Sequence, residues 1–516
     1  MHYRYVPGYL SSINKKYVVL VDKEFKMNEI YSSLGFKEHP FARFSAEEEK
    51  LYLQEIFVFP KYYSTIISDI KAGTSRFIFG TRGVGKSALI LKIIADSEEN
   101  HIFSVLIDDY DTIPLKNNER ELLLLVLGKL ATAFGVYLMN NKQCLKSLST
   151  EDREILALSF NAFFVTLSKK QFEKLSENIT HTKTLNIFKR LFNWFLLKPV
   201  NTVISGGTEI VGSMVAKALG LPSVGNTAVY REYIPEIKID SELDKVTSEN
   251  FDIRATKQIL FDLSGIIRKT GFCNVAVLFD KIDENRALGT QLNNITEFIN
   301  DIARDTALLL NDSCSFVFSM ISACKPPLIN SGVRCDKLKP IDITWEDEEV
   351  LRIVDQRLQY FSDKAITSIW DIISEDYKHN VLFLARQSPR QLLTLLSFIY
   401  DEQASIDCNV KIISKEAIEQ GLDHYTDEFD YVTYYAGANP KVLTRVINEL
   451  FKVKKVEFES KDLVAAFKIS TQAANQKIQS MLLFDLIEDI TVGSHAKKYR
   501  IKDPRIVYKI TRENIS

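Results

Sequence analysis

The segment Gly80–Ser87 reads Gly-Thr-Arg-Gly-Val-Gly-Lys-Ser, a complete GxxxxGK[ST] pattern. It follows the apolar run Arg76–Phe79 and precedes the apolar-rich run Ala88–Ile94, so a strand, a glycine turn and a helix are expected in that order. Glycines let the backbone curl with its N–H groups pointing inward, and the helix N-terminus adds partial positive charge. The pattern predicts a polyphosphate site formed by Gly80, Thr81, Arg82, Gly83, Val84, Gly85, Lys86, Ser87 and Ala88.

The loop also predicts two cofactors, ATP and Mg²⁺. Lys86 would place its charge between the β- and γ-phosphates, and Ser87 would hold the metal ion. A second apolar run, Val275–Phe279, ends in Asp-Lys-Ile-Asp-Glu. Ligands of parallel sheets bind beyond the carboxyl ends of the strands, so Asp280 is expected to share the metal with Ser87.

Other polar residues at predicted strand and helix ends are candidates for catalysis. Asp283 or Glu284 could activate the attacking water as a general base. Ser322 or Lys325, in the polar tip that ends the predicted strand 315–322, could sense the γ-phosphate, although a lysine at a strand end is more often simply solvated. Arg390, at the start of a predicted helix, could reach the phosphates or form a surface ion pair instead.

Composition limits the class of protein. The chain has 516 residues, of which 46% are hydrophobic and 26% charged, which is typical of a soluble protein of two to four domains. The formal charge of -2 favours neither nucleic acid nor membrane as a partner of the whole chain. The six cysteines form no CxxC pair and the N-terminus has no signal-peptide pattern, so a reduced, cytoplasmic protein is expected.

Two segments carry alternatives. The stretch 35–41, followed by a helix predicted to start at Ser45, could cover an adenine base or be a packing turn around a buried Phe.

About 190 residues separate Lys86 from Asp280, far more than one βα unit requires, so most of 115–250 is predicted to be a helical insertion. Helices are expected at 118–134, 150–167 and 169–175.

Within the insertion, 185–199 is basic and aromatic, and 200–221 is apolar with glycines. A membrane-surface or partner-binding hairpin is one interpretation. Pro199, Glu209 and Lys217 interrupt these runs, so neither offers 18 clean apolar residues, and a buried helical pair is favoured over a membrane.

The residues 440–510 are predicted to form three helices and a pair of strands, and this pattern resembles a winged helix. The segment holds 14 Lys and Arg against 8 Asp and Glu. A polar third helix with Lys477, and a wing with Lys497, Lys498 and Arg500, could bind duplex DNA. The alternative is a module that packs on the nucleotide domain and touches no DNA.

Together, the loop, the DxxDE strand end, the Trp345-led helix and the Ser388-Pro389-Arg390 helix start resemble the AAA+ and STAND P-loop ATPases over roughly 36–112 and 255–400. The DxxDE form is most similar to the NACHT-like, defence-associated bacterial branch. The resemblance implies an α/β fold with a five-stranded parallel sheet and a helical lid. It departs at Ala323-Cys324-Lys325, where Arg, Asn or Thr is expected, and it offers only Arg334 as a candidate arginine finger.

The expected organisation is therefore a lead-in at 1–45, a P-loop ATPase domain at 46–345, a lid at 346–430 and a winged helix at 431–516. The expected function is an ATP-dependent regulatory switch, and the resemblance implies antiviral defence with a separate effector protein and a possible homo-oligomer. The alternatives are a DNA-binding initiator-like or loader-like ATPase, and a nucleotide-bound scaffold with negligible turnover.

Overall fold

The computed structural model describes residues 30–164, 215–222, 251–289, 291–338, 340–435, 439–492 and 497–513. The chain forms two compact units. The first unit comprises 1–61, 80–92 and 343–516, and the second comprises 62–79 and 93–342. The predicted helix 169–175 and the run 185–199 lie outside the described residues, as does most of 200–221.

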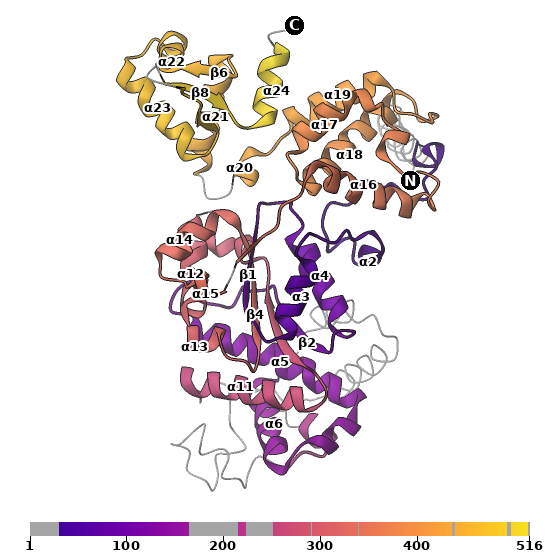
Figure 1. Ribbon diagram of the computed structural model, residues 1–516, viewed down its shortest axis with the longest axis vertical. Helices are drawn as coiled ribbons and strands as arrows, with labels where there is room; N and C mark the ends of the chain where they lie inside the picture. Colours follow the sequence, from indigo (N-terminus) through magenta and orange to yellow (C-terminus); the bar gives the residue numbers. More distant parts are fainter. Residues whose placement is uncertain are drawn as a thin grey trace, which may run out of the picture. The chain divides into compact units, whose positions relative to one another are not determined.

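The second unit is built on a five-stranded parallel sheet (Figure 1), as the resemblance implies. Its strand order is β2-β3-β4-β1-β5. Strands β3 and β4 are buried along their whole length, which explains their continuous apolar sequences. The strands are β1 (Arg76–Gly80), β2 (Ile102–Ile107), β3 (Asn274–Phe279), β4 (Ser315–Ile321) and β5 (Ile341–Asp342).

Register follows the pairing of apolar residues across the sheet. Ile107 pairs with Phe279, Phe279 with Phe318, and Ile78 with Ile341. The rings of Phe279 and Phe318 stack with their centroids 4.9 Å apart. Since all the strands are parallel, their carboxyl ends share one edge of the sheet.

Helices lie on both sides of this sheet, with α12 on one side and α3 on the other (Figure 1). The described part of the insertion is helical, as predicted, and α5, α6 and α11 pack on one another. The helices of this unit are α3 (Tyr63–Lys71), α5 (Glu119–Asn140), η1 (Lys142–Ser147), α6 (Thr150–Phe163), α11 (Ile253–Lys269), η4 (Ile282–Glu284), η5 (Arg286–Leu288), α12 (Leu292–Arg304), α13 (Thr306–Leu309), η6 (Ser322–Cys324), α14 (Lys325–Asn330) and α15 (Cys335–Leu338).

Among the described residues, α5 alone is long and apolar enough to cross a membrane. Of its most apolar window, 61% is buried inside the protein. It packs against β2, α6 and α11. Burial in the core therefore accounts for its composition.

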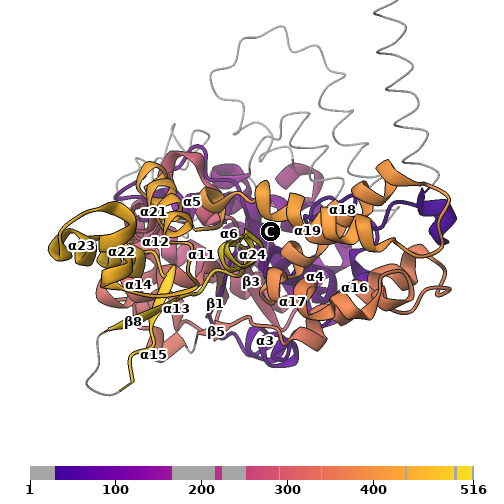
Figure 2. The ribbon, with the colours of Figure 1, turned by 90° about the horizontal axis from the view of Figure 1, so that it is seen from above.

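The first unit carries the loop after β1 and a helical lid, which we define as α16 to α19. Helix α18 packs against both α17 and α19, which are seen from above in Figure 2. Ser388 caps α18 by accepting a hydrogen bond from the Gln391 N–H, as expected of a helix start. The helices are α2 (Leu53–Ile56), α4 (Lys86–Ser97, which continues into the second unit), α16 (Asp347–Phe361), η7 (Ile369–Asp371), η8 (Glu375–Tyr377), α17 (Lys378–Ala385), α18 (Pro389–Ile406), α19 (Lys415–Asp427) and α20 (Tyr431–Tyr434).

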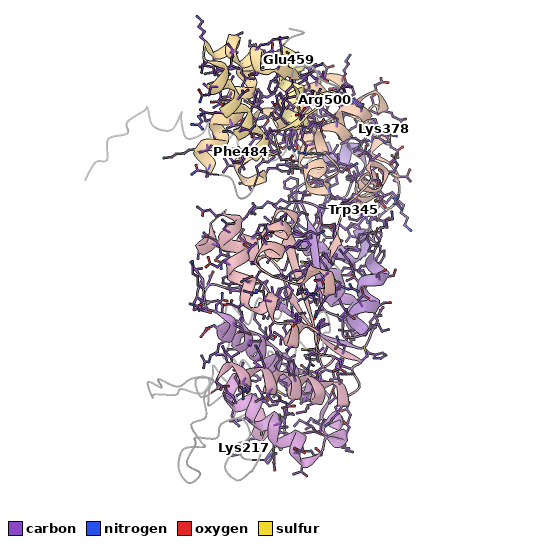
Figure 3. The ribbon with its side chains drawn as sticks, turned by 60° about the vertical axis from the view of Figure 1, so that its left-hand side comes forward. Lys217, Trp345, Lys378, Glu459, Phe484 and Arg500 are labelled. Atoms are coloured by element: carbon purple, nitrogen blue, oxygen red, sulfur yellow. The ribbon has the colours of Figure 1, made fainter. Side chains whose placement is uncertain are left out.

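The same unit ends in a C-terminal module, defined here as 439–492 and 497–513. Its small antiparallel sheet has the order β6-β8-β7, and Arg500 and Glu459 both lie on this module (Figure 3). The predicted helices and strands are present, and β6 and α24 are additional. The elements are α21 (Pro440–Val453), β6 (Glu457–Glu459), α22 (Ser460–Phe467), α23 (Thr471–Leu483), β7 (Ile487–Asp489), β8 (Lys498–Ile501) and α24 (Pro504–Glu513).

Two local predictions are wrong. No helix starts at Ser45: its hydroxyl binds the Glu48 carboxylate at 2.8 Å, and turns continue until α2 begins at Leu53. The largely apolar run 338–343 predicts a further strand, but only Ile341–Asp342 forms one, because Leu338 belongs to α15.

Candidate phosphate-binding site

The loop has the backbone that its glycines predict. Gly83 and Gly85 have φ angles of +80° and +97°, which residues with a side chain rarely adopt. At Gly80, a Cβ atom would lie 2.5 Å from Val84 Cγ1. The Lys86 ammonium donates to the carbonyl oxygens of Gly80 at 3.0 Å and Thr81 at 3.2 Å, so its charge lies over the loop.

The start of α18 packs directly against this loop. The Arg390 N–H donates to the Gly83 carbonyl oxygen at 3.2 Å. A Cβ atom at Gly83 would lie 2.8 Å from Ser388 Oγ and 2.9 Å from Arg390 Cβ. The Arg390 Nε donates to the Phe44 carbonyl oxygen at 3.3 Å. Arg390 is thus beside the phosphate loop although more than 300 residues separate the two in sequence.

Two further contacts hold the loop, and sequence reasoning missed both. The Trp345 indole, whose position is marked in Figure 3, donates to the Val84 carbonyl oxygen at 2.8 Å and is 7% exposed. A tryptophan that is buried usually donates its indole N–H to an acceptor, so Trp345 in the sequence could have indicated such a contact. Arg82 Nη1 donates to the Thr433 carbonyl oxygen at 3.0 Å.

The segment upstream of the loop is a buried turn. Phe41 is fully buried, and the His39 ring stacks on Tyr400 with centroids 4.0 Å apart. Arg357 of α16 pins the turn by donating to the carbonyl oxygens of Pro40 and Arg43. In the structure, the segment 35–41 is therefore a packing turn around a buried Phe, which is one of its two predicted interpretations.

In the second unit, Asp280 follows β3 and is 5% exposed. The Tyr110 hydroxyl donates to the carbonyl oxygens of Asp280 at 2.9 Å and Ile107 at 2.8 Å, which ties the ends of β2 and β3 together. Burial raises the pKa of Tyr110 well above its usual value, and the nearby carboxylates of Asp280, Asp108 and Asp283 raise it further. These carboxylates make this edge of the sheet acidic.

Lys281, directly after Asp280, has a left-handed backbone with φ of 59°. This turns the chain into η4, which carries Asp283 and Glu284. Asp283 is partly buried, whereas Glu284 is exposed. The two candidate bases thus share a single turn, directly after the buried aspartate.

Lys325 and Arg334 both have acidic partners. Lys325 begins α14, beyond the η6 turn that contains Ser322, and its ammonium lies 2.6 Å from Asp342. Arg334 forms two hydrogen bonds with Asp336, at 2.8 and 2.7 Å. The hydrogen bonds from Arg334 lower the pKa of Asp336 to about 2. A phosphate would have to compete with these carboxylates for either cation.

The basic residues of the C-terminal module are also paired. Lys477 lies 2.5 Å from Glu449, and Lys498 lies 2.5 Å from Glu457. Arg500 pairs with the same Glu457 at 2.7 Å. Exposed Lys497 directly precedes β8. The count of basic residues in the sequence therefore overstates the positive charge that this module presents.

No group of three or more His, Cys, Asp or Glu side chains suited to a metal ion occurs within the described ranges. The metal ligands predicted from the sequence are a hydroxyl and a single carboxylate, Ser87 and Asp280. Such hard oxygen donors suit Mg²⁺, which keeps several waters and binds one or two protein ligands together with phosphate.

Comparisons with known proteins place few constraints on function. No family model matches the sequence, and no curated protein matches it. The fold is similar to that of the Aeropyrum pernix ORC2 protein in its ADPNP–ADP complexes, with 8% identity, 90% of this chain and 98% of that chain covered, and a TM-score of 0.40. For the ADP form of the same protein, the identity is 8%, the coverage 93% and 98%, and the TM-score 0.35. A similarity this distant carries no information about ligands or partners of this chain.

Proposed function

We propose that this chain is an ATP-binding regulatory switch that hydrolyses ATP. The observation that carries the proposal is the loop itself, with left-handed Gly83 and Gly85 and the Lys86 ammonium lying over it. This backbone suits a chain of phosphates, because successive N–H groups can converge on an anion.

The roles of the residues follow from their chemistry. Lys86 would exchange its carbonyl acceptors for β- and γ-phosphate oxygens, which are stronger partners for a cation. Ser87 and Asp280 would hold Mg²⁺, Asp280 through a water molecule. When bound, the ion would neutralise charge on the phosphates.

Glu284 or Asp283 would orient and deprotonate the attacking water. Arg390 would reach the phosphates from α18, since its backbone already contacts Gly83. Lys325 would sense the γ-phosphate after releasing Asp342.

As a switch, the chain would transmit nucleotide state through the lid to a partner protein or to another copy of itself, in the cytoplasm. Of the two branches in the resemblance, the STAND-like one fits a regulatory rather than a motor role. The antiviral role that the resemblance implies gains no support from the described residues.

The test is phosphate release by the wild type, Lys86→Ala and Glu284→Gln. We expect Lys86→Ala to lose at least about 100-fold in turnover, because it removes charge stabilisation, and Glu284→Gln to lose as much where Glu284 rather than Asp283 is the base. Lys71→Ala, at an exposed position of α3, is the matched control and should keep wild-type turnover. Wild-type turnover equal to that of Lys86→Ala would refute hydrolysis, and tight ATP binding with no turnover would identify the scaffold alternative.

A second candidate is a DNA-binding ATPase, favoured by the polar face of α23. Gln472, Asn475, Gln476 and Gln479 are all exposed there. Replacing Lys477, Lys497, Lys498 and Arg500 with Glu should abolish a salt-dependent shift of duplex DNA if this face binds DNA. Because three of these cations are already paired with carboxylates, an unchanged shift, or none in the wild type, would leave the switch as the better account.

A further inference from the structure

Helix α20 lies between the lid and the C-terminal module in the sequence and is fixed by residues from both. Asp430 caps it, accepting a hydrogen bond from the Thr433 N–H at 3.0 Å. The side chain of Asn439 caps the following helix, α21. A four-residue helix is too short to be stable alone, so its conformation depends on what it contacts.

On one side, α20 is clamped to α24. The guanidinium of Arg505 is fully buried and lies 4.0 Å from the ring centre of Phe429 and 4.4 Å from that of Tyr434. Arg505 forms hydrogen bonds with Asp503, and the Tyr435 hydroxyl donates to the same carboxylate at 2.6 Å. We call these five residues the aromatic clamp.

The clamp continues into the lid through α24. The Tyr508 hydroxyl donates to Asp423 at 3.2 Å, and Lys509 lies 2.6 Å from Asp427. Both acids belong to α19. A displacement of α20 would therefore disturb the contact of the C-terminal module with the lid.

On the other side, α20 is held by the phosphate loop. Arg82 is the third residue of that loop, and it donates to the Thr433 carbonyl oxygen. Burial tends to raise the pKa of Asp430, but hydrogen bonds from Thr433 and Val432 and the charge of Arg82 lower it overall. Arg82 therefore acts on both ends of α20: its charge acts on Asp430 before the helix, and its hydrogen bond holds Thr433 near the end.

We propose that Arg82 couples the phosphate loop to the C-terminal module: a polyphosphate at the loop draws Arg82 away from Thr433 and loosens α20 and its clamp. This regulation rests on the proposed nucleotide binding. A phosphate carries a full negative charge and can accept two parallel hydrogen bonds from one guanidinium, whereas the Thr433 carbonyl is neutral, so the phosphate wins the competition.

Hydrogen exchange of the full chain, with and without saturating ATP and Mg²⁺, tests the coupling. In the wild type we expect ATP to speed exchange of the Tyr434 and Tyr435 amides about three- to tenfold, as loss of one such hydrogen bond predicts. In Arg82→Ala these amides exchange fast already and do not respond to ATP. Arg352→Ala, which removes an exposed arginine of α16, behaves like the wild type.

Asp430→Asn tests the same link without altering the loop, since Asn can still cap α20. Asp430→Asn removes the negative charge that attracts Arg82 to α20. Because coupling is reciprocal, this variant should bind ATP about two- to fivefold more tightly, which calorimetry measures. If ATP binds the wild type but neither the exchange nor the Asp430→Asn affinity changes, the coupling is wrong and the proposed function stands. If the wild type does not bind ATP, both proposals fail.

Discussion

At the scale of single residues, one ionisable group with a strongly shifted pKa lies in the turn upstream of the phosphate loop. His39 is partly buried against Tyr400, and its Nδ1 accepts a hydrogen bond from the Phe41 N–H at 3.1 Å. Burial, together with the smaller effect of the charge of Arg357, lowers its pKa to about 4. The turn upstream of the loop therefore requires a neutral histidine.

This histidine makes stability depend on pH. Between pH 6.5 and about 4 the unfolded chain binds a proton at this position and the folded chain does not, so stability is complete above 6.5 and falls as the pH drops. The loss should reach up to about 3 kcal/mol. Urea unfolding at a series of pH values checks it: His39→Gln should flatten this slope, whereas the same change at exposed His379 should leave it intact.

At the scale of elements, the lid depends on a close approach of two helices. Gly421 of α19 faces α18 so closely that a Cβ atom there would lie 2.5 Å from the Cα of Ile399. Backbone atoms cannot move aside as a flexible side chain can, so α18 and α19 would have to separate. Because α18 also carries Arg390, this contact helps to position the start of α18 against the phosphate loop.

Gly421→Ala should therefore destabilise the protein by about 2 kcal/mol or more, through overpacking. Gly265 in α11 is the matched comparison, since a Cβ atom there meets nothing within 4 Å. Gly265→Ala should stabilise its helix by about 0.5–1 kcal/mol, because alanine is the better helix former. The Tm of both variants, measured by thermal unfolding, tests this difference. A similar change in Tm for the two would contradict the packing argument.

The elements that sequence analysis predicted correctly have a strong local signal. Strands β1, β3 and β4 are continuous apolar runs, and Ser388 followed by Pro389 is typical of a helix start. The missed elements differ: β6 has three residues and exists only by pairing with β8. Helix α24 had a readable signal in Asp503-Pro504, a capping residue followed by proline.

Side-chain partners were harder to predict than elements. The pairing of Lys325 with Asp342 and of Lys498 with Glu457 depends on which strands and helices become neighbours. Nothing in the local sequence specifies these partners. The same is true of the carbonyl oxygens that accept hydrogen bonds from Trp345 and Arg82.

At the scale of the whole molecule, a buried ion pair joins two parts of the first unit. Asp503 and Arg505 have fully buried side chains, and they link the C-terminal module to the segment that follows the lid. Burial would raise the pKa of Asp503, but the charge and hydrogen bonds of Arg505 hold it below its usual value. The carboxylate therefore stays ionised where water is excluded.

Asp503→Ala should cost about 3–5 kcal/mol, because Arg505 would remain buried without its counter-ion. The double variant Asp503→Ala/Arg505→Met should recover much of this loss, since apolar residues can replace a buried ion pair at little cost. Urea unfolding followed by tyrosine fluorescence measures both. A double variant as unstable as the single one would show that the unpaired charge is not the cause.

The aromatic clamp also sets an order for folding during synthesis. Phe429 and Tyr434 leave the ribosome some 70 residues before Arg505, the cation on which both rings pack. Until that residue emerges, the rings lack their partner, and a growing chain exposes apolar surface that favours aggregation. A nascent chain therefore cannot complete the junction between lid and C-terminal module until Arg505 has left the ribosome, and ribosomes that stall earlier would release a substrate for chaperones or proteases.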